Sequence, residues 1–456
     1  MPGIATNPTD GPVAAQRSLA DAKLWFGLGV LSLLVVGPMS IVLVLARLPV
    51  VSEWMFIDAG FPRRALVVHV NVALGVWFFV MLAGLFCLLP GARPLRLTRV
   101  SQGLALLGTL VFMSSMFIGE AEPVRSNYVP ALDHGLFLAG LALFAGAIAL
   151  NFLDARMVSR SHTAQLPPGT MWGMRMGGLA YVLALGTIAA AWATQSAGMT
   201  PLQFYERLFW GGGHVLQFAH VLGMCSAWLL LLWRIAPAAA QGLGPAWLLA
   251  WLATPSLAGP WLGSRGDSAG WFTLMMQFGI FPPVLLLLLL IGTRLLRAGV
   301  APGALRTPEF VGTATAACMT LIGFVLGALI SGQTTLIPAH YHVSIGAVTA
   351  TYMAVIMAML PNFGLPLSAR MRRLATWQPL VFGVGQVVMA LGFGAAALER
   401  KVYGAEQELQ TPAEVAAMSV MGLGGAIALA GGLIFVVVIA AGWQGRIANF
   451  NLAGRR

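Results

Sequence analysis

The chain has 456 residues, of which 58% are hydrophobic and only 9% are charged, and its mean hydropathy is +0.83. A soluble protein of this length carries about 25% charged residues, so the composition excludes a soluble enzyme and indicates a polytopic membrane protein. The net charge of +11 does not indicate nucleic-acid binding, because the arginines and lysines lie mainly in short loops between apolar runs. The three cysteines lie in separate apolar runs without CxxC spacing, which predicts neither disulfides nor a zinc site.

The N-terminal segment Met1–Asp21 is polar and contains prolines, without the short apolar core and small-residue cleavage site of a signal peptide. We therefore expect residues 1–23 to form a cytoplasmic tail. Residues 24–442 are expected to form one membrane domain, and residues 443–456 a basic cytoplasmic tail.

Apolar runs of about 20 residues, the length that crosses a bilayer as a helix, recur twelve times. The seventh run is interrupted by Pro255 and Pro260 and is the least regular. The sequence therefore predicts an all-α protein with twelve transmembrane helices. The expected spans are Leu24–Ala46, Ala65–Leu89, Val100–Ile118, Ala131–Leu153, Gly177–Ala193, Trp210–Leu232, Leu243–Leu262, Ala269–Ile291, Gly312–Ile330, Pro338–Leu360, Trp377–Leu398 and Ala416–Ala441.

Loop charges predict the orientation of these spans. Arginines gather in the loops that follow even-numbered spans, such as Arg156, Arg160 and Arg175, whereas acidic residues such as Glu120 and Glu122 gather on the other side. Because positively charged loops stay on the cytoplasmic side, both termini are expected to be cytoplasmic. The prediction is a multi-pass protein of a bacterial-type inner (cell) membrane.

With this orientation, five of the seven histidines fall near the outer surface, at the starts of even-numbered spans. They are His69 in the second span, His134 in the fourth, His214 in the sixth, and His340 and His342 in the tenth. Ionisable residues inside a membrane are functional candidates. Scattered structural histidines have no reason to share one layer, whereas a common cofactor plane supplies one.

His340 and His342 are two residues apart, so on a helix they point about 200° apart, towards opposite sides. One metal is not easily held by both, but two cofactors flanking one helix could be; the alternative is a pair of interface histidines. Neutral imidazole is a common axial ligand of haem iron. His69 with one member of the pair could hold a first haem, and the other member a second, and spacing leaves open which member does which.

His214 follows the glycines 211–213, which weaken a helix but also permit close approach of a flat ligand or of backbone. The alternative is a flexible helix end. His220 lies six residues further on, about 240° around the helix, so the two histidines do not form a joint metal site. We expect His220 to serve packing or hydrogen bonding.

These segments resemble subunit I of the haem-copper oxidase superfamily, which includes nitric oxide reductases, over nearly all of the chain. Ala339–Gly346 is similar to the tenth-helix His-x-His motif, and His69 falls where the second-helix haem ligand belongs. Trp210–Phe218 is similar to the sixth-helix segment that carries the first ligand of the active-site copper or iron. Asn127–His134 and Trp377–Gln386 resemble the short cbb3-type or nitric-oxide-reductase-like forms.

The resemblance implies a subunit-I-like bundle with two haems, whose types it does not give. His69 and His342 would hold the low-spin haem, His340 would hold the high-spin haem, and His214 is the candidate ligand of copper or non-haem iron. Such a cytochrome c oxidase-like protein passes electrons from an outer-side donor through the low-spin haem to the high-spin haem, which binds O2 or NO.

The electron donor is expected to be cytochrome c or a haem- or copper-bearing partner subunit, because the chain lacks a Cys-x-x-Cys-His haem attachment and a copper-thiolate motif. The resemblance also places Arg400 and Lys401 where the family keeps basic residues for haem propionates. A propionate favours a cationic hydrogen-bond donor.

The chain also departs from the family pattern. It lacks the seventh-helix His-His pair that completes the copper or iron site, and it has Leu216 and Phe218 where oxidases carry Glu and Tyr. A single imidazole is a poor copper site. The alternative to a terminal oxidase or nitric oxide reductase is therefore a non-enzymatic haem electron carrier or gas-binding membrane protein, and a third is a haem-free transporter.

Overall fold

The computed structural model describes residues 12–45, 60–91, 95–159, 166–242, 244–331, 334–398, 409 and 411–453. Among these residues, eleven helices are long and apolar enough to cross a membrane. The chain divides into two units. The first comprises residues 1–46, 50–230 and 240–293, and the second comprises residues 47–49, 231–239 and 294–456.

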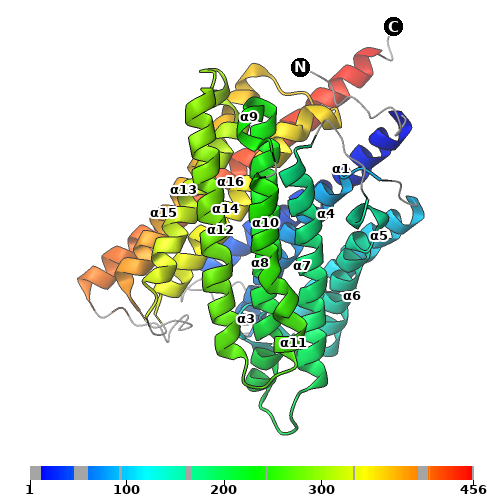
Figure 1. Cartoon of the computed structure of the whole chain (residues 1–456). Helices are drawn as coiled ribbons and strands as arrows, with labels where there is room; N and C mark the ends of the chain where they lie inside the picture. Colours follow the sequence, from blue (N-terminus) through cyan, green and yellow to red (C-terminus); the bar gives the residue numbers. More distant parts are fainter. Residues whose placement is uncertain are drawn as a thin grey trace. The chain divides into compact units, whose positions relative to one another are not determined.

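The first unit holds most of the helices, among them those labelled α5, α6 and α7 in Figure 1. It also holds a two-stranded antiparallel sheet. The ends of α8 and α12 continue into the second unit. The elements of the first unit are α1 (Pro12–Leu45), α3 (Phe61–Val70), α4 (Trp77–Cys87), α5 (Leu95–Ser114), β1 (Glu122–Val124), β2 (Ala131–Asp133), α6 (Gly135–Phe152), α7 (Pro168–Ala193), α8 (Pro201–Ile235), α10 (Gly244–Ala253), α11 (Gly259–Gly263) and α12 (Ala269–Ala298).

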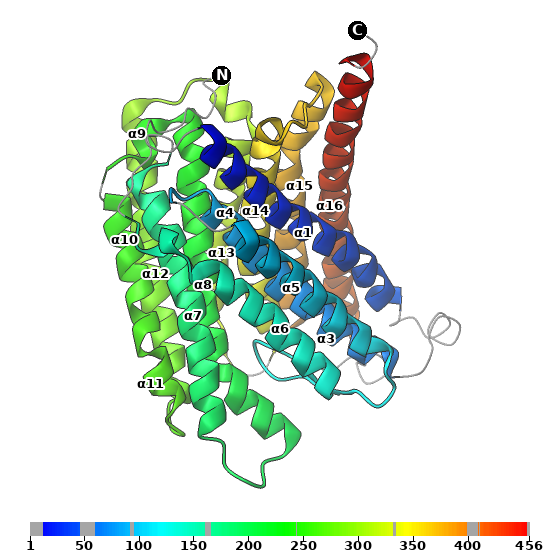
Figure 2. The same cartoon turned by 90° about the vertical axis from the view of Figure 1, so that its right-hand side faces the viewer.

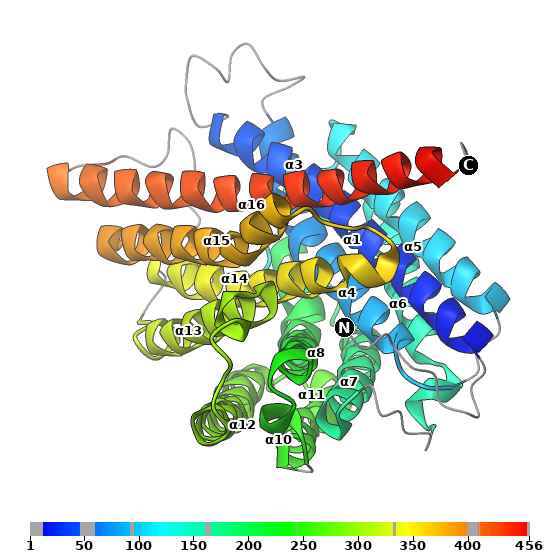
Figure 3. The same cartoon turned by 90° about the horizontal axis from the view of Figure 1, so that it is seen from above.

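The second unit is a row of four long helices, each packed against the next, as Figure 3 shows. They are α13 (Pro308–Ala328), α14 (Leu336–Met359), α15 (Ala369–Ala396) and α16 (Pro412–Ala453), and the short α9 (Pro237–Ala240) also belongs to this unit. A Cβ on Gly385 of α15 would overlap the backbone of Ala428, and one on Gly424 of α16 would overlap the backbone of Met389. Small residues therefore let α15 and α16 approach backbone to backbone, as they do in many membrane bundles.

The eleven long helices coincide with eleven of the twelve expected spans, which confirms the all-α membrane fold. The remaining span, the seventh, consists of α10, a 3-10 segment (Thr254–Ala258) and α11 in succession. Pro255 lies in the 3-10 segment and Pro260 in α11, and proline removes a helical hydrogen bond. Figure 1 shows α10 and α11 lying along α7.

Several helices extend beyond the expected spans, and two of the wrong boundaries lie beside candidate histidines. The fourth span does not begin at Ala131, because residues 131–133 form β2, which pairs with β1. His134 is therefore not inside the helix: it is the extended N-cap of α6, and its Nδ1 accepts a hydrogen bond from the Leu136 N–H at 3.2 Å. The sixth span does not begin at Trp210, because α8 already begins at Pro201. Figure 2 shows the α6 helix beside α5.

The second span is not a uniform α-helix. Between α3 and α4 lies a π-helix, Asn71–Val76. Its first side chain, Asn71, donates Nδ2–H bonds to Val67 O at 2.9 Å and to Pro130 O at 2.7 Å. The π-helix therefore begins where an asparagine ties the helix to a neighbouring loop.

Exposed tryptophans mark the two ends of the first unit's outer helices. Trp172 and Trp247 lie near the starts of α7 and α10, and Trp192 and Trp261 lie near the ends of α7 and α11. Trp172 and Trp192 are 20 residues apart on one helix, which corresponds to about 30 Å. This is the thickness of a bilayer's hydrocarbon core, and tryptophan is enriched at both of its borders, so the unit is built to span a membrane.

Candidate functional site

His340 and His342 both lie in the regular part of α14, so the sequence correctly places them on opposite sides of one helix. The His340 side chain contacts α13, where its Nδ1 makes a 2.7 Å hydrogen bond to Gly323 O. The His342 ring instead stacks on Phe393 of α15, with ring centroids 5.6 Å apart and planes 14° apart. The two imidazoles therefore face two different neighbouring helices.

The carbonyl bond settles the state of the His340 ring. A carbonyl oxygen can only accept, so Nδ1 donates to it, and in the neutral imidazole Nε2 then keeps its lone pair. Metal-ligating histidines almost always donate their other ring N–H to such a carbonyl or carboxylate, which orients the ring. Gly327 of α13 lies against the ring, because a Cβ there would be 2.9 Å from its Nδ1 and Cε1. His340 therefore fits an axial haem ligand.

His69 lies near the end of α3, immediately before the π-helix. Its Nδ1 is buried and has no hydrogen-bond partner among the described residues. A buried polar atom without a partner is destabilising by roughly 1–3 kcal/mol, and π-helical turns occur frequently at functional sites. The π-helical turn beside His69 suits a ligand role, whereas no acceptor among the described residues orients its ring as Gly323 O orients the ring of His340.

His214 is only 1% exposed, and both of its ring nitrogens are engaged. Nδ1 makes a 2.7 Å hydrogen bond to Trp210 O, one turn earlier in α8, and Nε2 is 2.8 Å from the hydroxyl of Tyr128. Because Trp210 O can only accept, Nδ1 donates to it, and in the neutral imidazole Nε2 accepts from the Tyr128 hydroxyl. Tyr128 is thus a residue of this site that was not among the expected ligands.

The three glycines before His214 serve side-chain packing. A Cβ on Gly211 would overlap Phe272 of α12, one on Gly212 would overlap Ile188 of α7, and one on Gly213 would overlap Tyr128. The helix is continuous through all three, so the alternative of a frayed helix end is wrong. The expected close approach does occur, but it is made by protein side chains.

Of the other expected residues, His220 serves packing, and two lie outside the described part of the chain. The His220 ring lies 4.9 Å from Phe78 and 4.6 Å from Phe79, the packing environment expected of it. Arg400 and Lys401 lie outside the described residues. His69 and His214 belong to the first unit, and His340 and His342 belong to the second.

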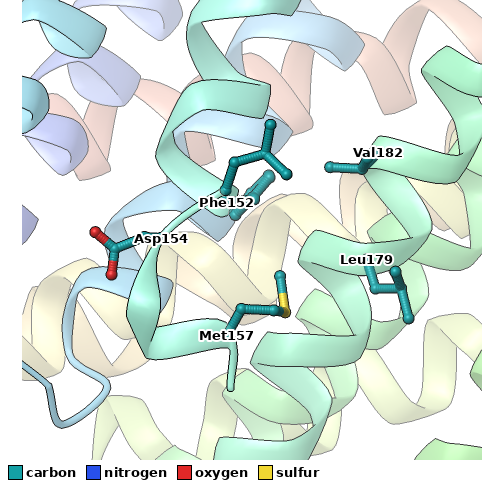
Figure 4. A pocket seen from close by; sticks show the side chains of 6 residues that line it. Phe152, Asp154, Met157, Leu179 and Val182 are labelled. Carbon is teal, nitrogen blue, oxygen red and sulfur yellow. The ribbon is translucent and has the colours of Figure 1, made fainter. Parts of the chain in front are cut away.

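Two cavities are lined almost entirely by apolar side chains. One of about 310 Å³ lies between α6 and α7 and contains a single carboxylate, Asp154 (Figure 4). Asp154 caps a short 3-10 helix by accepting from the Arg156 N–H at 2.9 Å. Another, of about 450 Å³, lies between α13 and α15 beside Cys318. Neither cavity is lined by a histidine, so neither is a candidate haem site.

No family model matches the sequence. A solved haem-copper terminal oxidase dimer is similar to the chain with a TM-score of 0.68 and 17% sequence identity, over 97% of this chain and 84% of that one. The chain has the fold of a haem-copper oxidase. The expected subunit-I-like bundle is thereby confirmed.

Two curated relatives carry no functional description. An uncharacterised protein of Aquifex aeolicus (strain VF5) is 26% identical over 354 residues, which cover 75% of this chain and 85% of that protein. An uncharacterised protein of Rickettsia prowazekii (strain Madrid E) is 27% identical over 256 residues, which are 48% of this chain and 47% of that protein. The chain thus matches about half the length of the second relative.

Proposed function

We propose that this chain is a haem-binding electron-transfer subunit, similar to subunit I of a terminal oxidase. His69 and His342 would be the axial ligands of a low-spin haem, and His340 would be the single protein ligand of a second, high-spin haem. The observation that carries the proposal is the His340 imidazole, whose Nδ1–H is bound to Gly323 O at 2.7 Å and whose Nε2 keeps its lone pair.

Each ligand has a described environment that suits its role. The Gly323 carbonyl fixes the tautomer and the orientation of His340 and makes its Nε2 more basic. Phe393 stacks on His342 and restricts the rotation of its ring. His69 lies beside the π-helix Asn71–Val76, a type of turn that occurs frequently at functional sites. Haem would supply one-electron transfer and, where one iron face is open, a binding position for O2 or NO.

The remaining parts of the proposal come from the family resemblance. Electrons would enter from cytochrome c or from a haem- or copper-bearing partner subunit at the outer side of a bacterial-type inner membrane. Arg400 and Lys401 would bind haem propionates through charge-assisted hydrogen bonds.

A second candidate is a haem protein that carries electrons or binds O2, NO or CO without turnover. The engagement of both His214 nitrogens favours this candidate, since it leaves no lone pair on that ring for the metal that works beside the high-spin haem in the family. Oxygen or NO consumption driven by reduced cytochrome c, and abolished in His340→Ala, would decide for the enzyme.

A reduced-minus-oxidised spectrum of the purified chain, with and without CO, tests the haem assignment. We expect two haems per chain, of which one responds to CO. His340→Ala should lose the CO response, and His69→Ala or His342→Ala should lose the low-spin signal. His134→Asn, which keeps an N-cap side chain on α6, should lose neither. Protein from a haem-sufficient host without a Soret band would contradict the proposal and favour a transporter.

A further inference from the structure

Tyr128 has an unusual backbone for a bulky residue. Its φ is +65°, a region that side chains other than those of Gly, Asn and Asp rarely adopt. It is the central residue of a three-residue turn closed by the Val129 N–H, which donates to Asn127 O at 2.8 Å. A γ-turn with positive φ is the rarer and strained form, and strain of this kind persists only where the surroundings enforce it.

Hydrogen bonds of Ser126 and Asn127, the two residues before Tyr128, hold the chain in this turn. Asn127 donates twice to the Glu206 carboxylate of α8, from its backbone N–H at 2.9 Å and from Nδ2 at 2.8 Å. The Ser126 hydroxyl donates to Val129 O at 2.7 Å, across the turn. Hydrogen bonds to an ionised carboxylate are stronger than those between neutral groups. Asn127, the residue before Tyr128, is therefore held firmly against α8.

Two further bonds hold the loop beyond the turn. Asn71 of the π-helix donates to Pro130 O at 2.7 Å. The Tyr205 hydroxyl of α8 donates to the Asp133 carboxylate at 2.7 Å. Residues 125–134 are here called the strap. The strap is bonded to α8 before Tyr128, and to both the second span and α8 after Tyr128.

The strap delivers the Tyr128 hydroxyl to Nε2 of His214 at 2.8 Å. Gly213 makes this possible, because any side chain there would overlap the Tyr128 ring. The ring centroids of Tyr128 and His214 lie 4.3 Å apart, and Trp210 closes the cluster at 4.9 Å from His214. The result is a phenol O–H···N bond between a half-buried tyrosine and a buried histidine.

These residues do not fit a copper or non-haem iron ion. Such a metal binds an imidazole through a lone pair and takes several nitrogen, sulfur or carboxylate ligands together. Here the Nε2 lone pair accepts the Tyr128 hydroxyl. Among the described residues, no group of three or more His, Cys, Asp or Glu side chains is arranged to hold a metal.

We propose that a tyrosine–histidine hydrogen bond occupies the position at which the haem-copper oxidase resemblance expects a metal ligand. Tyr128, carried by the strap, holds His214 as a neutral imidazole with its proton on Nδ1, and the chain carries no second metal there. This inference deepens the proposed function and rests on it for the haems, whereas the Tyr128–His214 pair lies within the first unit alone.

Metal analysis of the full-length chain provides the first test. The expected result is the same non-haem copper and iron content, below stoichiometric, in the wild type and in His214→Gln. One copper or non-haem iron per chain in the wild type, lost in His214→Gln, would overturn the inference.

The histidine nitrogen spectrum of protein labelled with 15N-histidine provides the second test, with His214→Gln to assign the signals. We expect the tautomer with protonated Nδ1, and Tyr128→Phe should shift the Nε2 signal. Tyr181→Phe is the matched control, because the Tyr181 hydroxyl donates to Ala145 O and does not contact His214. An Nε2 signal unmoved by Tyr128→Phe would overturn the inference. Absence of haem would contradict the proposed function but leave these signals in place.

Discussion

Gly327 shows how closely a single residue controls the proposed haem ligand. A methyl group there would lie 2.9 Å from two atoms of the His340 ring, which is itself held by Gly323 O. We expect Gly327→Ala to displace the ring and to weaken or abolish the CO-responsive haem signal. The measurement is the reduced-minus-oxidised spectrum with CO.

The loss could not be ascribed to a weaker helix, because alanine is a better helix former than glycine by about 1 kcal/mol. Gly432→Ala in α16 is the control, since nothing lies within 4 Å of a Cβ at that position. An unaltered CO response in Gly327→Ala would show that the ring has room to move and that Gly327 does not position it.

At the residue scale, the sequence predicts the part of the site that depends on local spacing. His340 and His342 lie two residues apart in one helix, and their opposite directions follow from helical geometry alone. The hydroxyl of Tyr128 reaches His214 across 86 residues of sequence, and no periodicity links them. A contact between residues so far apart in sequence depends on the course of the loop in space, which local sequence patterns do not predict.

At the element scale, the contact of α15 with α16 depends on glycines at the helix interface. We expect Gly424→Leu to force the two backbones apart and to destabilise the protein, by about 1–3 kcal/mol as for other overpacked interiors. Thermal unfolding in detergent measures the loss. Gly422→Leu, two residues away on the same helix and facing open space, should change the midpoint little. Equal shifts in both variants would contradict the interface role.

Hydropathy predicts the existence of the membrane helices better than their ends. Pro201 begins α8 nine residues before the apolar run, and Thr200 precedes it with its hydroxyl accepting from Gln203 N at 3.4 Å. Threonine followed by proline is a helix-start signal that an apolar-run search ignores. Ala131 and Leu132 are apolar yet lie in β2, because pairing with β1 competes with helix formation.

At the scale of the whole molecule, the charges of the loops predict the orientation of the protein in the membrane. The tryptophans at both ends of α7 place its borders, but they do not distinguish the two sides. We expect green fluorescent protein fused after Arg456 to fluoresce, because both termini are predicted to be cytoplasmic. Alkaline phosphatase fused after Gly119 should be active. The opposite pair of results would reverse the topology.

The similarity at 17% identity shows that the haem-copper oxidase fold tolerates extensive sequence change. Apolar spans and small interface residues suffice for such a bundle, and many sequences supply them. The His-His pair of the seventh helix is absent from this chain, and an interrupted helix occupies that span.

The π-helix Asn71–Val76 divides the second span into two separately phased halves. His69 belongs to α3, the half before the π-helix, whereas the buried Trp77 and Phe78 belong to α4, the half after it. Adding or removing one residue between them rotates one half against the other by about 100°. An inserted or deleted residue in the π-helix would therefore redirect the His69 imidazole while leaving the sequence of α4, with its buried Trp77 and Phe78, unchanged.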